Sequence, residues 1–185
     1  MKLSKFLNIT GAMCLAAAVG CTVNVASAAE VKTAEKTATN TETLSLLDGE
    51  QVFTVQGYVA QPVPGGAPGK MYVNKQAKRV LLIGEEEIPL IARAASDSDF
   101  LDGMKSIKDQ QKASSPAYTV VSEKTENAKG LEVYHLEATN NMGGNDVLQA
   151  TLLAVAHNKF TVIQVISNHK DKSGHLAAVN NILGK

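Results

Sequence analysis

Histidines and the acidic residues near them are the side chains of this sequence best suited to acid–base or metal chemistry. His169 and His175 are six residues apart, which fits neither adjacent turns of one helix nor the HExxH pattern of zinc hydrolases. We therefore expect both at exposed turns or helix caps. His135 lies close to Glu137 in an extended segment, and it would belong to a site only if another element supplied a partner. The remaining histidine, His157, falls in a predicted turn.

Three consecutive glutamates, Glu85, Glu86 and Glu87, are the densest group of carboxylates. Carboxylate oxygens are the ligands that hard cations such as Ca²⁺ prefer. Consecutive side chains point in different directions, however, and no DxDxD loop surrounds the three. We therefore predict a solvated acidic turn and no metal site.

Catalytic motifs are absent from the sequence. It has no GxSxG elbow, and the glycine-containing segment 140–145 lacks the GxxxxGK[ST] pattern of a phosphate-binding loop. No set of Ser, His and Asp residues stands out by its spacing. We therefore predict no catalytic residue and no cofactor, and we expect that the protein is not an enzyme.

The two cysteines both lie near the N-terminus, in a segment with the features of an export signal. Lys2 and Lys5 precede an apolar stretch that is too short to span a membrane. Two cleavage sites fit this segment. A cut after Gly20 would make Cys21 an acylated N-terminus, whereas a cut after Ala28 would release an unmodified chain. Both remain open, so we expect a signal peptide over residues 1–28, or over 1–20 if the protein is a lipoprotein.

The rest of the sequence divides into a polar leader and one domain. Residues 29–44 are rich in Thr, Glu, Lys and Ala and are expected to form a disordered tether. Residues 45–185 have the usual length of one domain. Without Lys2 and Lys5, 16 basic residues face 18 acidic ones, a net charge of about −2. No basic patch with interleaved aromatic residues is present, which argues against nucleic acid as a partner.

Apolar segments separated by turn residues predict an antiparallel sheet. The turn 46–49 leads into a strand, and the segment 61–70, rich in proline and glycine, reads as an exposed loop. Short polar connections predict three hairpins, and near-continuous apolar runs predict strands that are covered on both faces. The expected strands are 51–59, 70–75, 79–84, 117–124, 131–139, 149–157 and 159–167.

Two segments have the apolar spacing of helices. In residues 96–113, an apolar stripe follows Ser96 and Asp99, which resemble a capping box. In residues 171–185, the expected stripe is Leu176, Val179, Ile182 and Leu183, with Asp171 or Ser173 as cap and Gly184 as stop. The predicted fold class is therefore α+β: a three-layer α/β/α sandwich with a mostly antiparallel sheet and helices on both faces.

Several landmarks, in order, give the sequence a resemblance to DcrB-like envelope proteins of Gram-negative bacteria. They are LLDG at 46–49, MYV at 71–73 before VLLIG at 80–84, KDQQ at 108–111 followed by Pro116, and a final short amphipathic helix. The resemblance implies a PsbP-like fold and a periplasm-facing lipoprotein that acts without catalysis. The connection at 85–98 is longer than the acidic turn usual in that family.

The resemblance also implies a function. DcrB-type proteins serve as host factors in phage entry, so we expect a non-enzymatic protein of the cell envelope that contacts other envelope proteins. The expected location is the periplasm, with lipid anchoring to the outer membrane if Cys21 is acylated. Two alternatives stay open: a periplasmic carrier of a small ligand, and a small hydrolase using His135 or Glu137.

Overall fold

The computed structural model describes residues 40–185, which form nine strands, three α-helices and three short 3₁₀ turns. The strands are β1 (Thr41–Leu46), β2 (Gln51–Gln56), β3 (Val59–Gln61), β4 (Lys70–Asn74), β5 (Arg79–Glu87), β6 (Thr119–Ala128), β7 (Leu131–Met142), β8 (Asn145–Ala156) and β9 (Lys159–Asn168). The helices are α1 (Asp97–Met104), α2 (Ile107–Ser114) and α3 (Lys172–Leu183), and the 3₁₀ turns are η2 (Leu47–Gly49), η3 (Pro64–Gly66) and η4 (Leu90–Ala92).

Seven strands form one sheet in the order β3-β4-β5-β9-β8-β7-β6, and every neighbouring pair is antiparallel. The three predicted hairpins are confirmed. The β8–β9 hairpin turns through His157 and Asn158, which both have positive φ, as a two-residue turn of the primed type requires. An α+β class with a mostly antiparallel sheet is therefore confirmed.

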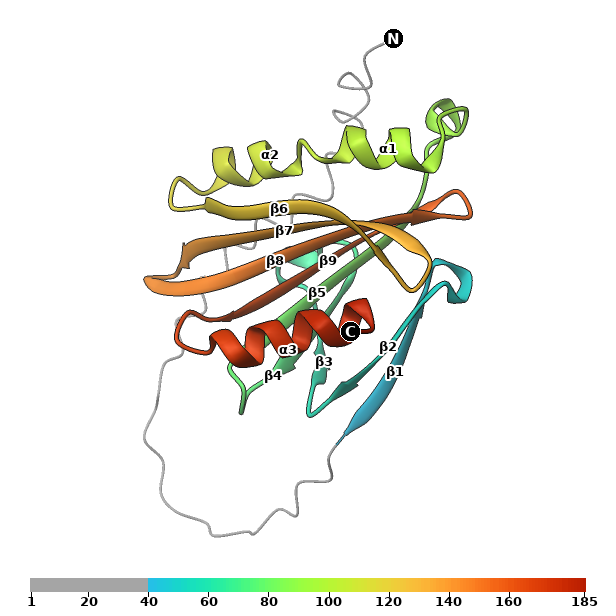
Figure 1. The fold of residues 1–185 in the computed structure, drawn as a ribbon. Coiled ribbons are helices and arrows are strands. Elements are labelled where there is room, and N and C mark those ends of the chain that lie inside the picture. Colours follow the sequence, from blue (N-terminus) through green and yellow to red (C-terminus); the bar gives the residue numbers. More distant parts are fainter. Residues whose placement is uncertain (1–39) are drawn as a thin grey trace, which may run out of the picture.

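Different elements cover the two faces of this sheet. Figure 1 shows α1 and α2 on one side, and α3 with the small β1–β2 hairpin on the other. Alternate residues of β7 divide between two apolar clusters: Val133 packs with α3 and the hairpin, and Tyr134 and Leu136 pack with α1. Strand β9 and the last eight residues of β8 are almost wholly buried because both of their faces are covered.

Two boundaries predicted near the start of the domain are wrong. The domain does not begin at residue 45, because β1 starts at Thr41 within the expected tether and buries Leu44 and Leu46. The expected strand 51–59 is broken at Gly57, which has a φ of 73°. Strand β2 before this break pairs with β1, whereas β3 after it joins the large sheet.

The single helix expected at 96–113 is two helices separated by Lys105 and Ser106. The Ser106 hydroxyl donates to the carbonyl of Gly103 over 3.3 Å, a local hydrogen bond that competes with helix continuation. The cap at Ser96 is confirmed, since its hydroxyl oxygen accepts from the backbone N–H of Asp99.

The C-terminal helix α3 has the expected ends. Asp171 caps it by accepting from the N–H of Gly174, and Gly184 ends it in the left-handed conformation. The predicted stripe is wrong at one position. Leu176 is 55% exposed, and His175 is 5% exposed and takes its place against the sheet. Among residues 40–185, no helix has the length and apolar character needed to cross a membrane.

Candidate functional site: a buried polar network and a surface groove

A cluster of ionisable side chains lies between the sheet and α3, in which the histidines are buried and the glutamates are half-buried. His135 in β7 lies between two carboxylates: its Nδ1 is 2.9 Å from Oε1 of Glu126 in β6, and its Nε2 is 2.7 Å from Oε1 of Glu137. Strand alternation places residues 133, 135 and 137 on the face toward α3. Glu126 of β6 is thus the partner from another element that His135 needs in order to belong to a site.

The other oxygen of Glu137 extends the network to α3. Its Oε2 lies 3.0 Å from Nε2 of His175, and Nδ1 of His175 lies 2.9 Å from the hydroxyl of Ser167 in β9. The Nε of Arg79 donates to the same hydroxyl over 3.0 Å, and its guanidinium pairs with Asp171 at 2.6 Å. One continuous chain of contacts therefore runs from the start of α3 through four strands.

At its other end the network reaches the C-terminal residue. Glu126 pairs with Lys185 and also with Lys124, at 3.1 Å. The last residue of the chain and the cap residue of α3 are therefore both tied to the sheet by charge. Each carboxylate in the buried part has at least two partners, as buried charges require.

The ion pairs determine how these groups titrate. Burial favours the neutral form of Glu137, but hydrogen bonds from His135 and His175 outweigh burial and lower its pKa to about 2. Burial likewise opposes the charge of Glu126, whereas Lys185, His135 and Lys124 bring its pKa to about 2. Burial alone would lower the pKa of His135, yet hydrogen bonds to Glu137 and Glu126 raise it.

Ser167, His175 and Glu137 are connected in the manner of a hydrolytic triad. Their surroundings differ from those of an active site, however. Ser167 is 1% exposed and His175 is 5% exposed, so neither is presented to a substrate. Arg79 also donates a hydrogen bond to the serine oxygen that would have to attack. The arrangement is well suited to fastening α3 to the sheet.

Sequence reasoning located part of this network and missed part. The sequence places His135 close to Glu137, as the structure does, but the expectation that His175 is exposed is wrong. The signal that identifies it is its spacing from Val179, Ile182 and Leu183, which places all four on the buried side of α3. His169, by contrast, is exposed as expected.

The remaining predicted site residues fall elsewhere. The three glutamates at 85–87 form the end of β5, paired with β9, so a separate acidic turn is wrong. Glu85 accepts from the N–H of Leu47, and Glu87 pairs with Arg93. Among residues 40–185, no group of His, Cys, Asp or Glu has an arrangement that would hold a metal ion. The lipidation candidate Cys21 and the cleavage candidates Gly20 and Ala28 lie outside the described residues.

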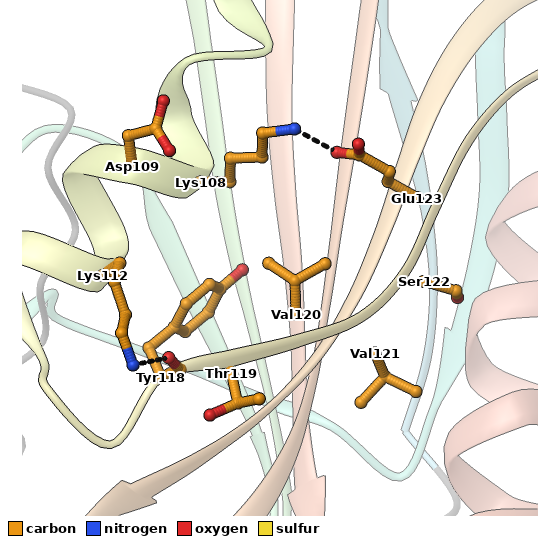
Figure 2. Close-up of a pocket in the computed structure, with 9 residues that line it drawn as sticks. All are labelled: Lys108, Asp109, Lys112, Tyr118, Thr119, Val120, Val121, Ser122 and Glu123. Carbon is orange, nitrogen blue, oxygen red and sulfur yellow. Dashed lines mark hydrogen bonds and ion pairs between the residues drawn. The ribbon is translucent and has the colours of Figure 1, made fainter.

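A groove of about 530 Å³ lies between α2 and the edge strand β6 (Figure 2). Lys108 of α2 crosses it to pair with Glu123 at 2.6 Å, and Lys112 donates to the carbonyl of Tyr118 over 2.8 Å. Burial raises the pKa of the Tyr118 hydroxyl to about 12. The lining residues are Lys108, Asp109, Lys112, Tyr118, Thr119, Val120, Val121, Ser122 and Glu123.

Strand β6 forms one outer edge of the large sheet, and no strand of the described residues pairs with its outer side. It is ten residues long, and its first seven residues are all exposed. Val120 and Val121 are 40% and 66% exposed, and the pairing with β7 shifts register between Val120 and Ser122. The groove therefore borders unpaired backbone and exposed aliphatic side chains.

Comparisons with known proteins define the class of fold. No protein-family profile and no curated protein sequence matches the chain. The solution structure of cyanobacterial PsbP (CyanoP) from Synechocystis sp. PCC 6803 superposes with a TM-score of 0.52 and 14% identity, over 86% of this chain and 96% of that one. The chain therefore has a PsbP-like fold. LpqN of Mycobacterium tuberculosis, described as involved in cell envelope biogenesis, has a TM-score of 0.48 at 10% identity, over 82% of this chain and 85% of its own.

Proposed function

We propose that this chain is an exported, non-enzymatic protein of the cell envelope that works by contacting other proteins, with β6 and its groove as the contact surface. The observation that carries the proposal is the open edge of β6. Long edge strands expose unpaired backbone groups, and proteins usually protect them. The later part of β6 is protected in this way by Glu123 and Lys124, but at its start Val120 and Val121 lie exposed beside the edge.

The contact that suits this edge is the addition of an extended segment from a partner. In such complexes the backbone of the added strand hydrogen-bonds to the sheet edge, and adjoining pockets accept alternate side chains. The groove beside α2 provides such a pocket, with Val120 at its wall and Lys108 and Asp109 at its rim. Charged side chains at the rim suit a protein segment better than they suit the largely apolar ligand cavity of a small-molecule carrier.

The buried network supports a role without catalysis. The serine and histidine that have triad-like connectivity are sealed between α3 and the sheet, and every polar atom that would react already has a partner. The PsbP-like fold and the DcrB-like landmarks add support for a periplasmic location. Attachment to the outer membrane through acylated Cys21 is part of the same proposal.

Complementation of a deletion strain tests the contact surface. We expect the full-length double variant Val120→Lys, Val121→Lys to fold and to reach the envelope but to fail in restoring the function that is lost on deletion. The matched control is Val52→Lys, because Val52 in β2 is 39% exposed, close to the 40% of Val120. Full restoration by the double variant would exclude β6 as the contact surface.

A second variant tests the absence of catalysis. Ser167→Ala removes the only hydroxyl of the triad-like chain and keeps the small side chain, so we expect it to complement fully. A fluorophosphonate probe is expected to leave Ser167 of the native protein unlabelled. Labelling of Ser167, or loss of complementation by a folded Ser167→Ala protein, would indicate a hydrolase.

A further inference from the structure

The connection between β5 and α1 presents two large aliphatic side chains to solvent. Leu90 is 80% exposed and Ile91 is 66% exposed, and Leu90 is the most exposed large apolar residue among residues 40–185. Adjacent exposed aliphatic residues of this size mark interaction sites more often than scattered single ones do. This pair, the Leu90–Ile91 tip, belongs to neither the buried network nor the β6 groove.

The tip is held in place by its own loop. On either side of it, Ile88 and Ala92 are buried in the apolar cluster beneath α1. The N–H of Ala92 donates to the carbonyl of Pro89 over 2.8 Å, and Nε of Arg93 donates to the carbonyl of Ile88 over 2.9 Å. Because the loop is already ordered, little conformational entropy is lost when the tip becomes buried in a complex.

Acidic residues flank the tip in the sequence. The segment 85–99 contains five acidic residues and one arginine, a formal charge of −5 + 1 = −4. The arginine, Arg93, is paired with Glu87 at 2.7 Å. The acidic residues are Glu85, Glu86, Glu87, Asp97 and Asp99.

We propose that the Leu90–Ile91 tip is a second contact site, which inserts into an apolar pocket rimmed by Lys or Arg on a protein partner. Complementary charge at the rim would orient the two proteins, and burial of the two aliphatic side chains would supply most of the affinity. The acidic flanks disfavour insertion into an anionic membrane surface, because like charges repel. In Figure 1 the loop before α1 and the α2 end beside β6 lie at opposite ends of the α1–α2 layer. Substitutions can therefore disrupt the Leu90–Ile91 tip without disrupting the β6 surface, and the reverse.

Site-specific cross-linking of the full-length chain in its native cells tests this proposal. A photo-reactive amino acid replaces Ala94, which is exposed close to the tip, and the cross-linked peptides are sequenced by mass spectrometry. We expect one adduct, in which the partner peptide carries Lys or Arg beside apolar residues. The variant Leu90→Ser, Ile91→Ser is expected to reduce the adduct at least about tenfold.

Two further variants separate charge from general surface effects. Glu86→Gln combined with Asp97→Asn is expected to reduce the adduct and its sensitivity to salt. Leu176→Ser is the matched control, since Leu176 is 55% exposed on α3, and it should leave the adduct unchanged. The β6 double variant should also leave it unchanged, which distinguishes this site from the surface in the proposed function.

Three outcomes would overturn the proposal. An adduct between two copies of this chain would assign the tip to self-association. Binding of the purified protein to phosphatidylglycerol vesicles that is lost with Leu90→Ser, Ile91→Ser would assign it to a membrane. An adduct that is insensitive to both the apolar and the charge variants would show that the tip makes no specific contact.

Discussion

His135 lies between two carboxylates, and that position links the stability of the domain to pH. Its pKa is raised above 6.5, so the stabilisation it contributes is complete below about pH 6.5 and is lost as the pH rises through the raised value. The pKa of Glu137 is lowered from 4.5 to about 2, so its contribution is complete above about pH 4.5 and is lost as the pH falls toward 2. The two effects together favour maximal stability between these limits.

We therefore expect the free energy of unfolding to be highest between about pH 4.5 and 6.5. Urea unfolding of residues 40–185 across pH 3 to 9 measures this dependence. In His135→Gln, the decline above about pH 6.5 should be much reduced, because the group that releases a proton is gone. His169→Gln is the control, since His169 is exposed. An unchanged decline in His135→Gln would assign the alkaline loss of stability to another group.

Gln164 in β9 differs from the residues of the network, because it is buried and its side-chain oxygen accepts no hydrogen bond. It is 2% exposed, and its Oε1 has no hydrogen-bond partner among residues 40–185. An apolar replacement of similar shape removes the desolvation cost of such an atom. We expect Gln164→Met to leave stability unchanged or to raise it by up to about 1 kcal/mol.

A second buried glutamine provides the matched control for this prediction. Gln149 in β8 is 3% exposed, but its Oε1 accepts a hydrogen bond from Nδ2 of Asn140. Gln149→Met should therefore lower stability by about 1 to 2 kcal/mol, because the Asn140 amide loses its partner. Thermal unfolding of both variants gives the comparison. Equal destabilisation by the two substitutions would show that Gln164 is satisfied in solution.

At the scale of secondary structure, local chemistry made the hairpins and helix ends predictable. The His157–Asn158 turn and the caps at Asp171 and Gly184 depend on residues close in sequence. The break between α1 and α2 is not predictable from the apolar stripe, which continues across it. The break depends on a hydrogen bond from the Ser106 hydroxyl to the carbonyl of Gly103. Strand β1 is not predictable from its own residues, because Leu44 and Leu46 are buried by residues that are distant in the sequence.

Helix α3 contains a glycine at which the usual helix propensity should be reversed. Within a helix, alanine is normally more stable than glycine by about 1 kcal/mol. At Gly174, however, an added Cβ would collide with the guanidinium of Arg79 and the carboxylate of Asp171, which are paired with each other. The ends of these two side chains can move away, but only by weakening their ion pair and the cap on Gly174, so we expect Gly174→Ala to destabilise the domain by about 1 kcal/mol in urea unfolding.

A double-mutant cycle identifies the cause of that loss. In the Arg79→Leu background the guanidinium is absent, so the further cost of Gly174→Ala should fall by at least about 1 kcal/mol. Purely additive effects would show that the collision with Arg79 does not determine the stability of this end of α3.

At the scale of the whole molecule, periodicity predicted the antiparallel sheet and its helices, but it did not predict the network that joins them. Residues 79, 126, 137, 167 and 175 come from five different elements, and their meeting depends on strand order. Only His135 and Glu137, which share one face of β7, could be linked from the sequence. The order of strands is set by packing between distant segments, which a single sequence does not reveal.

In the proposed function, one cleavage event determines whether the whole molecule is attached to a membrane. We expect signal cleavage after Gly20 and acylation of Cys21, because the resemblance to DcrB-like lipoproteins and the small residue before the cysteine both favour it. More than one acyl chain on Cys21 would hold the domain stably at a membrane, at about 0.8 kcal/mol for each buried methylene. Intact-mass spectrometry of the native protein should show a diacyl or triacyl adduct on a chain that begins at Cys21. The Cys21→Ser variant should lose that mass and leave the membrane fraction. An unmodified wild-type chain that begins at Ala29 would instead establish the cut after Ala28 and a domain without a lipid anchor.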